Sequence, residues 1–178
     1  MIGESDFRCR MGRRNYLIEG VSCSGKTTIC NALRARGYQA INGDNELAYQ
    51  GDPATGAPLP GHDHAHHIWD VAKVRALAGD RSHEATFFCG GSRNFDRFIQ
   101  VFDRVFVLEL DSDTLERRLA VRPQGEWGAR PSEQDLIRRL HATGEDLPQD
   151  AVPIDATAPV DRVVEAILRE AGLPVDYP

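Results

Sequence analysis

The segment at residues 20–27 reads Gly-Val-Ser-Cys-Ser-Gly-Lys-Thr and fits the pattern G-x-x-x-x-G-K-[ST]. Glycines let a loop curl until successive backbone N–H groups converge on phosphate oxygens, and a following helix N-terminus adds positive potential. In such a loop Lys26 reaches the β and γ phosphates, and the Thr27 hydroxyl binds Mg²⁺. The alternative is a glycine-rich turn without a ligand. The expected phosphate-binding residues are Gly20, Ser22, Cys23, Ser24, Gly25, Lys26, Thr27 and Thr28.

The elements around this motif are those that a phosphate-binding loop needs. A short apolar run at residues 15–19 precedes it and predicts a buried strand. Ile29 and Leu33 lie four residues apart after it and predict a helix, which ends at Arg36 before Gly37. Residues 38–41 read as a second strand, so the chain opens as an α/β fold.

Polar residues follow the second and third predicted strands. Asp44 comes after the second strand, and Gly90, Gly91 and Arg93 come after the third. Ligands of an open parallel sheet bind beyond the carboxyl ends of its strands. Asp44 is therefore a candidate to orient or deprotonate an acceptor hydroxyl, and Arg93 a candidate to hold a carboxylate or phosphate. The alternatives are a helix N-cap for Asp44 and a surface position for Arg93.

Several arginines lie close together in the second half of the chain. We place Arg117, Arg118 and Arg122 on one helix, which leads into a polar insert at residues 123–131 that contains Arg130. Phosphoryl transfer spreads negative charge over the γ-phosphoryl oxygens, so mobile arginines there suit a kinase. Arg122 is the favoured candidate, whereas Arg117 and Arg118 fit a solvated helix face equally well.

The remaining apolar runs alternate with helical patterns, which predicts a three-layer α/β/α domain around a five-stranded parallel sheet. In order along the chain, the further predictions are a long loop at 50–63, a helix at 71–78, strands at 85–89 and 105–110, a helix capped by Asp113 and Glu116 and running through Arg122, a helix capped by Ser132 and Asp135, a strand at 152–155, and a last helix with Val160, Val163, Val164, Ile167 and Leu168 on its buried face.

Length and composition limit the classes of protein. The chain has 178 residues, of which 41% are hydrophobic and 27% charged, with a formal charge of −6. These values favour one globular domain at residues 15–178, after a flexible leader at 1–14. No apolar run approaches a membrane span or a secretory signal, so we expect a cytoplasmic protein. The acidic balance argues against a nucleic-acid partner.

Two groups of potential metal ligands occur. The cysteines Cys9, Cys23, Cys30 and Cys89 lack metal-ligand spacing and are expected to be reduced thiols. His62, His64, His66 and His67 lie in a loop without a familiar metal pattern. We expect these histidines at the surface or in a substrate pocket.

The chain resembles the small P-loop kinases of the nucleoside/nucleotide kinase, shikimate kinase and gluconate kinase group, including bacterial nucleoside kinase-like ATP-binding proteins. The resemblance rests on five segments in the same order: Gly20–Thr27, Asn42-Gly43-Asp44, Gly90-Gly91, residues 115–119 with Arg122, and residues 154–159. It covers about residues 15–172. Asn42 stands where shikimate kinases carry the first of two aspartates, and Gly-Gly-Ser at residues 90–92 stands where they carry Gly-Gly-Gly, which weakens a shikimate assignment. Cys89 ends the third predicted strand, where an acidic Walker B residue is expected.

The resemblance implies a sheet in the order 2-3-1-4-5, MgATP as the phosphoryl donor, and a mobile lid at about residues 122–132. It places Arg118, Asp155 and Thr157 on the ATP side. The acceptor would lie between Asp44, the 50–67 segment and Arg93. The residues expected to bind the acceptor are Asp44, Gly90, Gly91, Arg93 and Arg130, and the expected catalytic residues are Lys26, Asp44 and Arg122.

The sequence therefore predicts an ATP-dependent kinase of a small molecule with a hydroxyl or phosphate acceptor, first of all a nucleoside or nucleotide. Sugars, antibiotics and shikimate-like acids are the next acceptors. A different class is a nucleotide-binding switch that hydrolyses ATP or GTP slowly. The sequence also allows a degenerate protein that binds nucleotide without catalysis, but the presence of Lys26, Thr27 and Asp44 disfavours this alternative.

Overall fold

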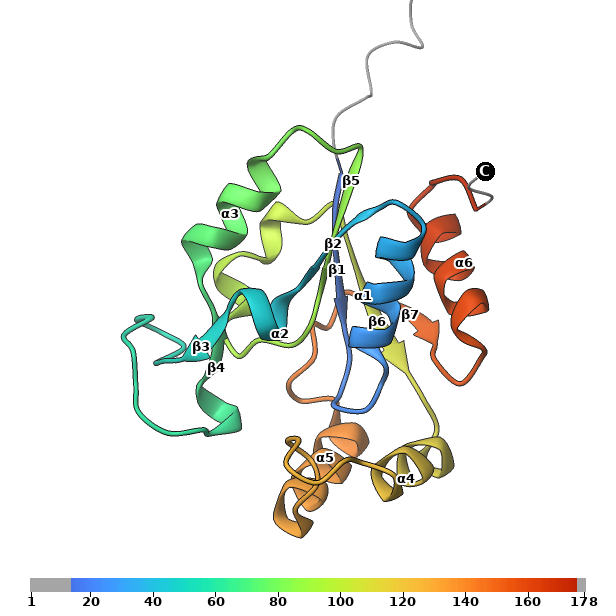
Figure 1. Ribbon diagram of the computed structural model, residues 1–178. Coiled ribbons are helices and arrows are strands. Elements are labelled where there is room, and N and C mark those ends of the chain that lie inside the picture. Colours follow the sequence, from blue (N-terminus) through green and yellow to red (C-terminus); the bar gives the residue numbers. More distant parts are fainter. Residues whose placement is uncertain (1–13, 176–178) are drawn as a thin grey trace, which may run out of the picture.

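The computed structural model describes residues 14–175 of the chain, and its centre is a five-stranded parallel sheet (Figure 1). In spatial order the strands are β2 (Gln39–Asn42), β5 (Ala85–Cys89), β1 (Arg14–Glu19), β6 (Arg104–Glu109) and β7 (Val152–Asp155). Counted along the sheet's own strands this is the order 2-3-1-4-5, as expected. The predicted leader at residues 1–14 lies outside the described residues, except for Arg14, which begins β1.

The central strand β1 is buried because helices cover both faces of the sheet. It pairs in parallel with β5 on one side, from Arg14 opposite Ala85 to Ile18 opposite Cys89, and with β6 on the other. Leu17 and Ile18 are fully buried on opposite faces of the sheet. This burial explains the continuous apolar run in the sequence.

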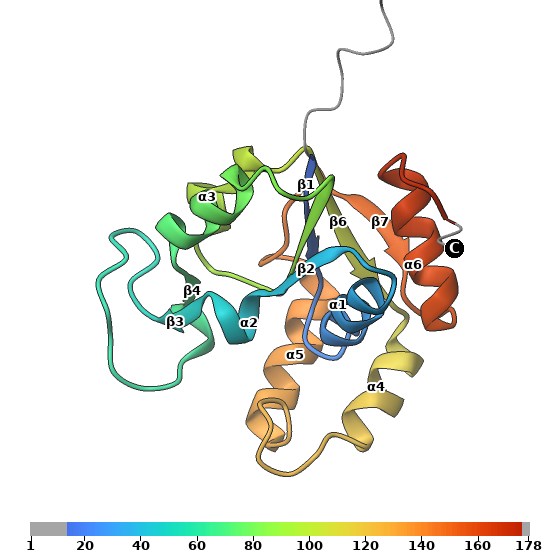
Figure 2. The same ribbon diagram turned by 45° about the horizontal axis from the view of Figure 1, so that its top comes forward.

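The helices form two layers over the sheet (Figures 1 and 2). Helices α1 (Lys26–Ala35) and α6 (Val160–Glu170) pack side by side on one face, where Ile29, Leu33 and Ile167 join the largest hydrophobic cluster. The other face is covered by α3 (Val71–Gly79) and by two short 3₁₀ turns at Phe95–Arg97 and Ile99–Val101. Val160, predicted on the buried face of α6, is 40% exposed.

Helices α4 (Ser112–Ala120) and α5 (Pro131–Thr143) lie beyond the carboxyl ends of the strands, with the 121–130 segment between them (Figure 2). The predicted cap of α4 at Asp113 is wrong, because the Asp111 side chain accepts the N–H of Thr114. Helix α4 also ends at Ala120, so Arg122 lies after it.

The predicted cap of α5 at Ser132 and Asp135 is wrong as well. The N-cap residue is Arg130, and Pro131 is the first helical residue. The Glu133 carboxylate accepts the backbone N–H groups of Gly128 and Arg130, at 2.8 and 3.3 Å. One acidic side chain therefore fixes both the helix start and the segment before it.

The predicted loop at residues 50–63 belongs to a longer segment, residues 48–69, whose two ends pair as a small hairpin. Strand β3 (Ala48–Gln50) pairs antiparallel with β4 (His67–Trp69), and the loop between them contains a 3₁₀ turn at His64–His66. We call this segment the β3–β4 excursion. The buried indole of Trp69 anchors this hairpin by stacking on Phe98, with the ring centroids 5.7 Å apart. Within residues 14–175 we find no helix whose length and apolar character would let it cross a membrane.

Candidate active site

The loop between β1 and α1 has the backbone shape that its glycines predict. Gly20 has φ +155°, and a Cβ there would lie 2.6 Å from the Ser24 hydroxyl oxygen. Gly25 has φ +104° and immediately precedes α1. Cys23 has φ +70°, and it is the one non-glycine residue among positions 14–175 with positive φ. The tight curl of the loop therefore includes Cys23, a residue with a side chain in a backbone conformation that is unfavourable for such residues.

The loop offers unsatisfied donors to a phosphate group. No side chain caps the N-terminus of α1, and its first turn contains no acidic residue, although the first N–H groups of a helix lack partners within the helix. The Ser24 hydroxyl is buried without a hydrogen-bond partner. The Lys26 ammonium donates to the carbonyl oxygens of Gly20 and Val21. These residues fit the phosphates of a nucleotide, because an anion would satisfy the unpaired N–H and hydroxyl donors and would be attracted by the Lys26 ammonium.

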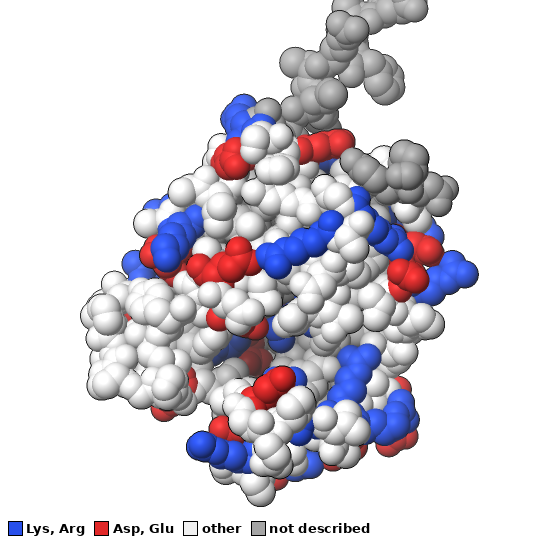
Figure 3. Space-filling view, in the orientation of Figure 1, with Lys and Arg blue, Asp and Glu red and all other residues white. Residues whose placement is uncertain are grey.

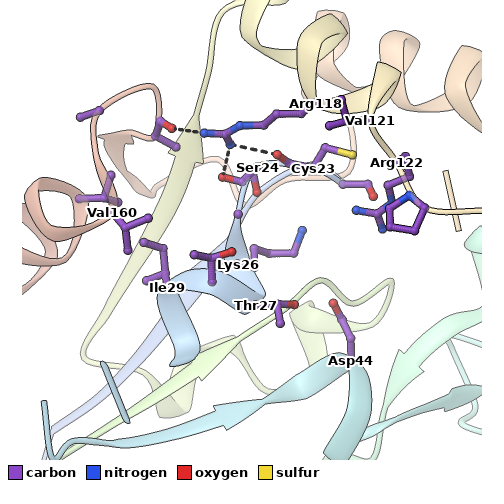
Figure 4. Close-up of a pocket in the computed structure, with 17 residues that line it drawn as sticks. Cys23, Ser24, Lys26, Thr27, Ile29, Asp44, Arg118, Val121, Arg122 and Val160 are labelled. Atoms are coloured by element: carbon purple, nitrogen blue, oxygen red, sulfur yellow. Dashed lines mark hydrogen bonds between the residues drawn. The ribbon is translucent and has the colours of Figure 1, made fainter. Parts of the chain in front are cut away.

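One cavity of about 420 Å³ extends from this loop to α4 and α6. The Arg118 guanidinium crosses it, donating to the carbonyl oxygens of Cys23 and Ser24 at 3.0 and 2.9 Å and to that of Ala156 at 2.8 Å (Figure 4). Ala156, Ala158 and Val160 line the far end. The cavity thus combines a polar loop for phosphates with an apolar end for a base.

Two residues expected on the ATP side have their side chains elsewhere. The Asp155 carboxylate accepts hydrogen bonds from the backbone N–H and the hydroxyl of Thr157, at 2.9 and 2.6 Å. This local turn holds the backbone of residues 155–157, and Ala156 and Ala158 line the cavity instead. Arg117 also turns away from it, donating to the Thr114 hydroxyl.

Asp44 lies at the end of β2, on the short helix α2 (Gly43–Glu46). It does not cap this helix, because Asn42 accepts the N–H of Asn45. The Asp44 carboxylate accepts the backbone N–H of Gly91 and faces the His67 imidazole, both at 3.2 Å. Burial opposes its ionisation, but the hydrogen bond with His67 and the charge of Lys26 outweigh burial, so the pKa of Asp44 is lowered.

The glycines after β5 make room for the side chains of Asp44 and Glu19. A Cβ on Gly90 would lie 2.8 Å from an Asp44 carboxylate oxygen, and a Cβ on Gly91 would lie 2.8 Å from Oε1 of Glu19. Gly90 also has φ +151°, which favours glycine. The Gly90-Gly91 pair therefore lets two carboxyl groups approach the same turn.

Glu19, the last residue of β1, was not among the residues predicted for the site. Its side chain is 1% exposed, its Oε2 atom has no hydrogen-bond partner, and Oε1 accepts the N–H of Gly20 at 3.4 Å. Burial raises the pKa of Glu19 to about 8, against the influence of Lys26 and Arg93. An acidic residue at the end of an apolar strand was the available signal, because such a side chain is costly to bury without a purpose.

A second cavity of about 440 Å³ lies between the loop at residues 20–25, the β3–β4 excursion and α5. Arg93 lines it and forms an ion pair with the Asp146 carboxylate at 2.6 Å. The same carboxylate lies 3.2 Å from Nε2 of His64. Burial opposes ionisation of Asp146, but His64 and Arg93 outweigh burial and lower its pKa. Asp146, like Glu19, was missed by sequence reasoning.

The histidines do not gather around a common point. His64 contacts Asp146, whereas His67 contacts Asp44, and both line the second cavity together with His62. Nowhere in residues 14–175 do three or more His, Cys, Asp or Glu side chains form a group that could hold a metal ion. Cys9 lies outside the described residues.

The 121–130 segment roofs the second cavity. The Nε of Arg122 donates to the Trp127 carbonyl oxygen at 3.0 Å and lies 3.4 Å from the Glu126 carboxylate. The Trp127 indole stacks on the His64 imidazole. Arg130 is exposed and lines neither cavity, because its backbone is committed to the start of α5.

The two cavities meet at one place. Figure 4 shows Lys26, Thr27, Asp44 and Arg122 pointing into a common space, and each of these four residues lines both cavities. The space-filling view shows the molecule hollowed between the sheet and the α4–α5 segment, with acidic and basic side chains inside (Figure 3). An ammonium, a hydroxyl, a carboxylate and a guanidinium group therefore surround the junction between the two cavities.

Comparison with solved structures places this arrangement in a known fold. Over 92% of this chain and 97% of the other, it is similar to a sugar kinase from a Janibacter species, with a TM-score of 0.57 and 22% sequence identity. The chain has the fold of the small P-loop kinases. A gluconokinase from Sinorhizobium meliloti matches with a TM-score of 0.56 and 23% identity, over 90% of this chain and 94% of that one.

A shikimate kinase matches with a similar TM-score but a lower sequence identity. A shikimate kinase from Acinetobacter baumannii, in complex with shikimate, matches with a TM-score of 0.57 and 13% identity over 91% of this chain and 95% of that one. No protein-family model matches the sequence, and no curated protein matches it. The resemblance predicted from the motifs is confirmed at the level of the fold.

Proposed function

We propose that this protein is an ATP-dependent kinase that transfers the γ-phosphoryl group of MgATP to a small-molecule acceptor. The observation that carries the proposal is the junction of two cavities of similar size at Lys26, Thr27, Asp44 and Arg122. A nucleotide in the first cavity would direct its terminal phosphate to this junction. An acceptor in the second cavity would meet the phosphate there.

Asp44 is the residue that we assign to the acceptor. Its ionised carboxylate takes the proton of the acceptor hydroxyl as the hydroxyl oxygen bonds to the γ-phosphorus atom. The bond between that phosphorus atom and the β–γ bridging oxygen breaks, and ADP leaves with the electron pair. Lys26 and Arg122 lie where negative charge develops on the transferred group, and preorganised cations stabilise such charge.

Thr27 and Asp44 are the residues that would hold Mg²⁺. Figure 4 shows their side-chain oxygens on the same side of the junction, and hydroxyl and carboxylate oxygens are ligands that Mg²⁺ accepts. The site suits a cation that keeps several waters, because these two side chains supply few ligands. When bound, Mg²⁺ neutralises charge on the β and γ phosphates.

A hydroxyl or a phosphate group can receive the phosphoryl group, and nucleosides and nucleotides are our first acceptor class. Sugars, antibiotics and shikimate-like acids come next. A nucleotide-binding switch with slow ATP or GTP hydrolysis is the rival function. The arginines around the junction favour transfer over a switch, since Arg122 reaches the phosphate end of both cavities.

ATP consumption across a panel of acceptors tests the proposal. A kinase consumes ATP rapidly only in the presence of a productive acceptor, and mass spectrometry then detects an acceptor heavier by one phosphoryl group. Turnover of the same slow rate with every acceptor and with none would identify a switch instead.

A further inference from the structure

The cationic side chains around the second cavity already have partners within the protein. Three of them line it, namely Lys26, Arg93 and Arg122. Lys26 belongs to the phosphate-binding loop, and Arg122 lies beside the Glu126 carboxylate at 3.4 Å. Arg93 lines this cavity but not the first one, and Asp146 neutralises its charge at 2.6 Å, with both side chains only 12% exposed.

Acidic side chains outnumber these cations in the cavity wall. The wall contains the carboxyl groups of Glu19, Asp44, Asp63, Glu126 and Asp146. Two of the three histidines in the wall, His64 and His67, are also paired with these acids, and the third, His62, is exposed at the rim. Recognition of a carboxylate or phosphate depends on a cation that is free to form a charge-assisted pair. Within the described residues of this wall, no arginine or lysine on the acceptor side is free in that sense.

Polar atoms without partners gather at the same cavity. Of the buried side-chain nitrogen and oxygen atoms in residues 14–175 that lack a hydrogen bond, three belong to residues of this wall: Oε2 of Glu19, Nε of Arg93 and Oδ1 of Asp146. One of them is a donor and one is an acceptor, while a Glu19 carboxyl that holds its proton can be either. Hydroxyl groups both donate and accept, so a ligand with several hydroxyls suits a wall made of carboxylates and paired cations, whereas a carboxylate or phosphate group can only accept.

We infer that the acceptor of this site is an uncharged molecule carrying several hydroxyl groups, and that Asp146 excludes acidic acceptors by neutralising Arg93. This inference rests on the proposed kinase function and narrows it. Of the acceptors considered above, it selects a neutral sugar, a polyol or the sugar of a nucleoside. It rejects nucleotides and sugar acids.

The test compares acceptors in matched pairs that differ by an acidic group. Suitable pairs are glucitol and gluconate, adenosine and adenosine monophosphate, and methyl shikimate and shikimate. For the productive pair we expect kcat/KM for the neutral member to be at least tenfold higher. The sugar and nucleoside pairs also distinguish the two sources of hydroxyl groups.

The outcomes separate this inference from the function on which it rests. Equal or faster transfer to the acidic member of a productive pair would overturn the inference and leave the kinase function standing. No transfer to any acceptor, with ATP hydrolysis independent of them all, would overturn the kinase function and the inference with it.

A charge-neutral variant tests the role of Asp146. Asp146→Asn keeps the size of the side chain but frees the charge of Arg93, so we expect the preference for the neutral member to fall about tenfold. Glu145→Gln is the matched control, because Glu145 is an exposed neighbour that pairs with Arg139 outside the cavity. An unchanged preference in Asp146→Asn would show that Asp146 does not set it. If that variant does not fold, the matched pairs with the wild-type protein decide alone.

Discussion

The Trp127 indole stacks on the His64 imidazole with ring centroids 5.1 Å apart and an angle of 18° between the ring planes. Trp127 belongs to the 121–130 segment and His64 to the excursion between β3 and β4. The stack therefore joins two walls of the second cavity. For an acceptor to reach Asp44, we expect this contact to open and close again, as lids do in enzymes that exclude water.

Fluorescence of Trp127 reports this movement. The chain has two tryptophans, and Trp69 is fully buried with an indole N–H that has no partner, so Trp69→Phe removes the second signal without breaking a hydrogen bond. We expect MgATP to change the emission of Trp127, and acceptor to change it further. His64→Ala in the same background should reduce the response. An emission spectrum unaffected by saturating MgATP and acceptor would indicate a fixed loop.

Replacing Lys26 tests the phosphate-binding loop. Lys26→Ala should lower turnover by ~10²-fold or more, which is the scale of a single electrostatic contact in the transition state. The melting temperature should stay close to that of the wild type, because the ammonium bonds only to loop carbonyls. The chain has one other lysine, Lys73, which is exposed on α3 and provides the control Lys73→Ala. Similar turnover in both variants would remove the loop from the mechanism.

Asp44→Asn separates acceptor activation from nucleotide binding. Asparagine keeps the shape but loses the charge that accepts a proton, so acceptor-dependent turnover should fall by ~10²-fold or more, with nucleotide affinity within a few-fold of wild type. Because the pKa of Asp44 is lowered, its carboxylate also stabilises the fold above its ordinary pKa, and this contribution is lost as pH falls through the lowered value. His67→Gln, which removes the neighbouring ring, should affect turnover less.

The buried carboxyl of Glu19 makes stability depend on pH. Between an ordinary glutamate pKa of ~4.3 and the raised value of about 8, the folded protein holds a proton that the unfolded chain has released. The free energy of unfolding should therefore decrease as pH rises across this range, by at most ~1.4 kcal/mol per pH unit from this group. Glu19→Gln should remove that decrease.

Denaturant unfolding at pH 5, 6, 7 and 8 measures this difference. The exposed variant Glu84→Gln controls for the loss of one carboxyl group. A constant difference in unfolding free energy between wild type and Glu19→Gln at all four values would show that Glu19 is ionised in the folded protein at neutral pH.

Local sequence determined much of this fold. Strand β5 begins and ends where its apolar run does, because it is buried at every position. Strand β7 also has the expected bounds, although it is an edge strand with two exposed residues. The shape of the loop at residues 20–25 could also be predicted, since its glycines determine the backbone locally. The N-cap of α4 could not be predicted, because Asp111 and Asp113 are both suitable N-cap residues and the structure uses Asp111.

The partners of the charged side chains in the second cavity could not be predicted, because contacts between distant parts of the chain create them. The sequence suggested Arg93 as a residue that could hold an anion, but it did not indicate that Asp146, 53 positions later, would form an ion pair with it. The β3–β4 hairpin consists of two three-residue strands separated by a long loop. Such strands are too short to show an alternation of apolar and polar residues. The position of Glu19 beneath Gly91 likewise depends on the pairing of β1 with β5.

The contacts of Arg118 bear on the order in which substrates bind. One guanidinium already ties the phosphate-binding loop to the chain after β7 through three carbonyl oxygens. If a nucleotide binds here as proposed, the two sides of its site are joined beforehand, so the protein should lose little conformational entropy on binding. The proposed acceptor, by contrast, is expected to displace the Trp127–His64 stack to enter the second cavity. Kinetics should thus show that ATP binds to the free enzyme with the same affinity as in the presence of acceptor. Substitutions in the 121–130 segment should change the association rate of the acceptor and leave that of ATP unchanged.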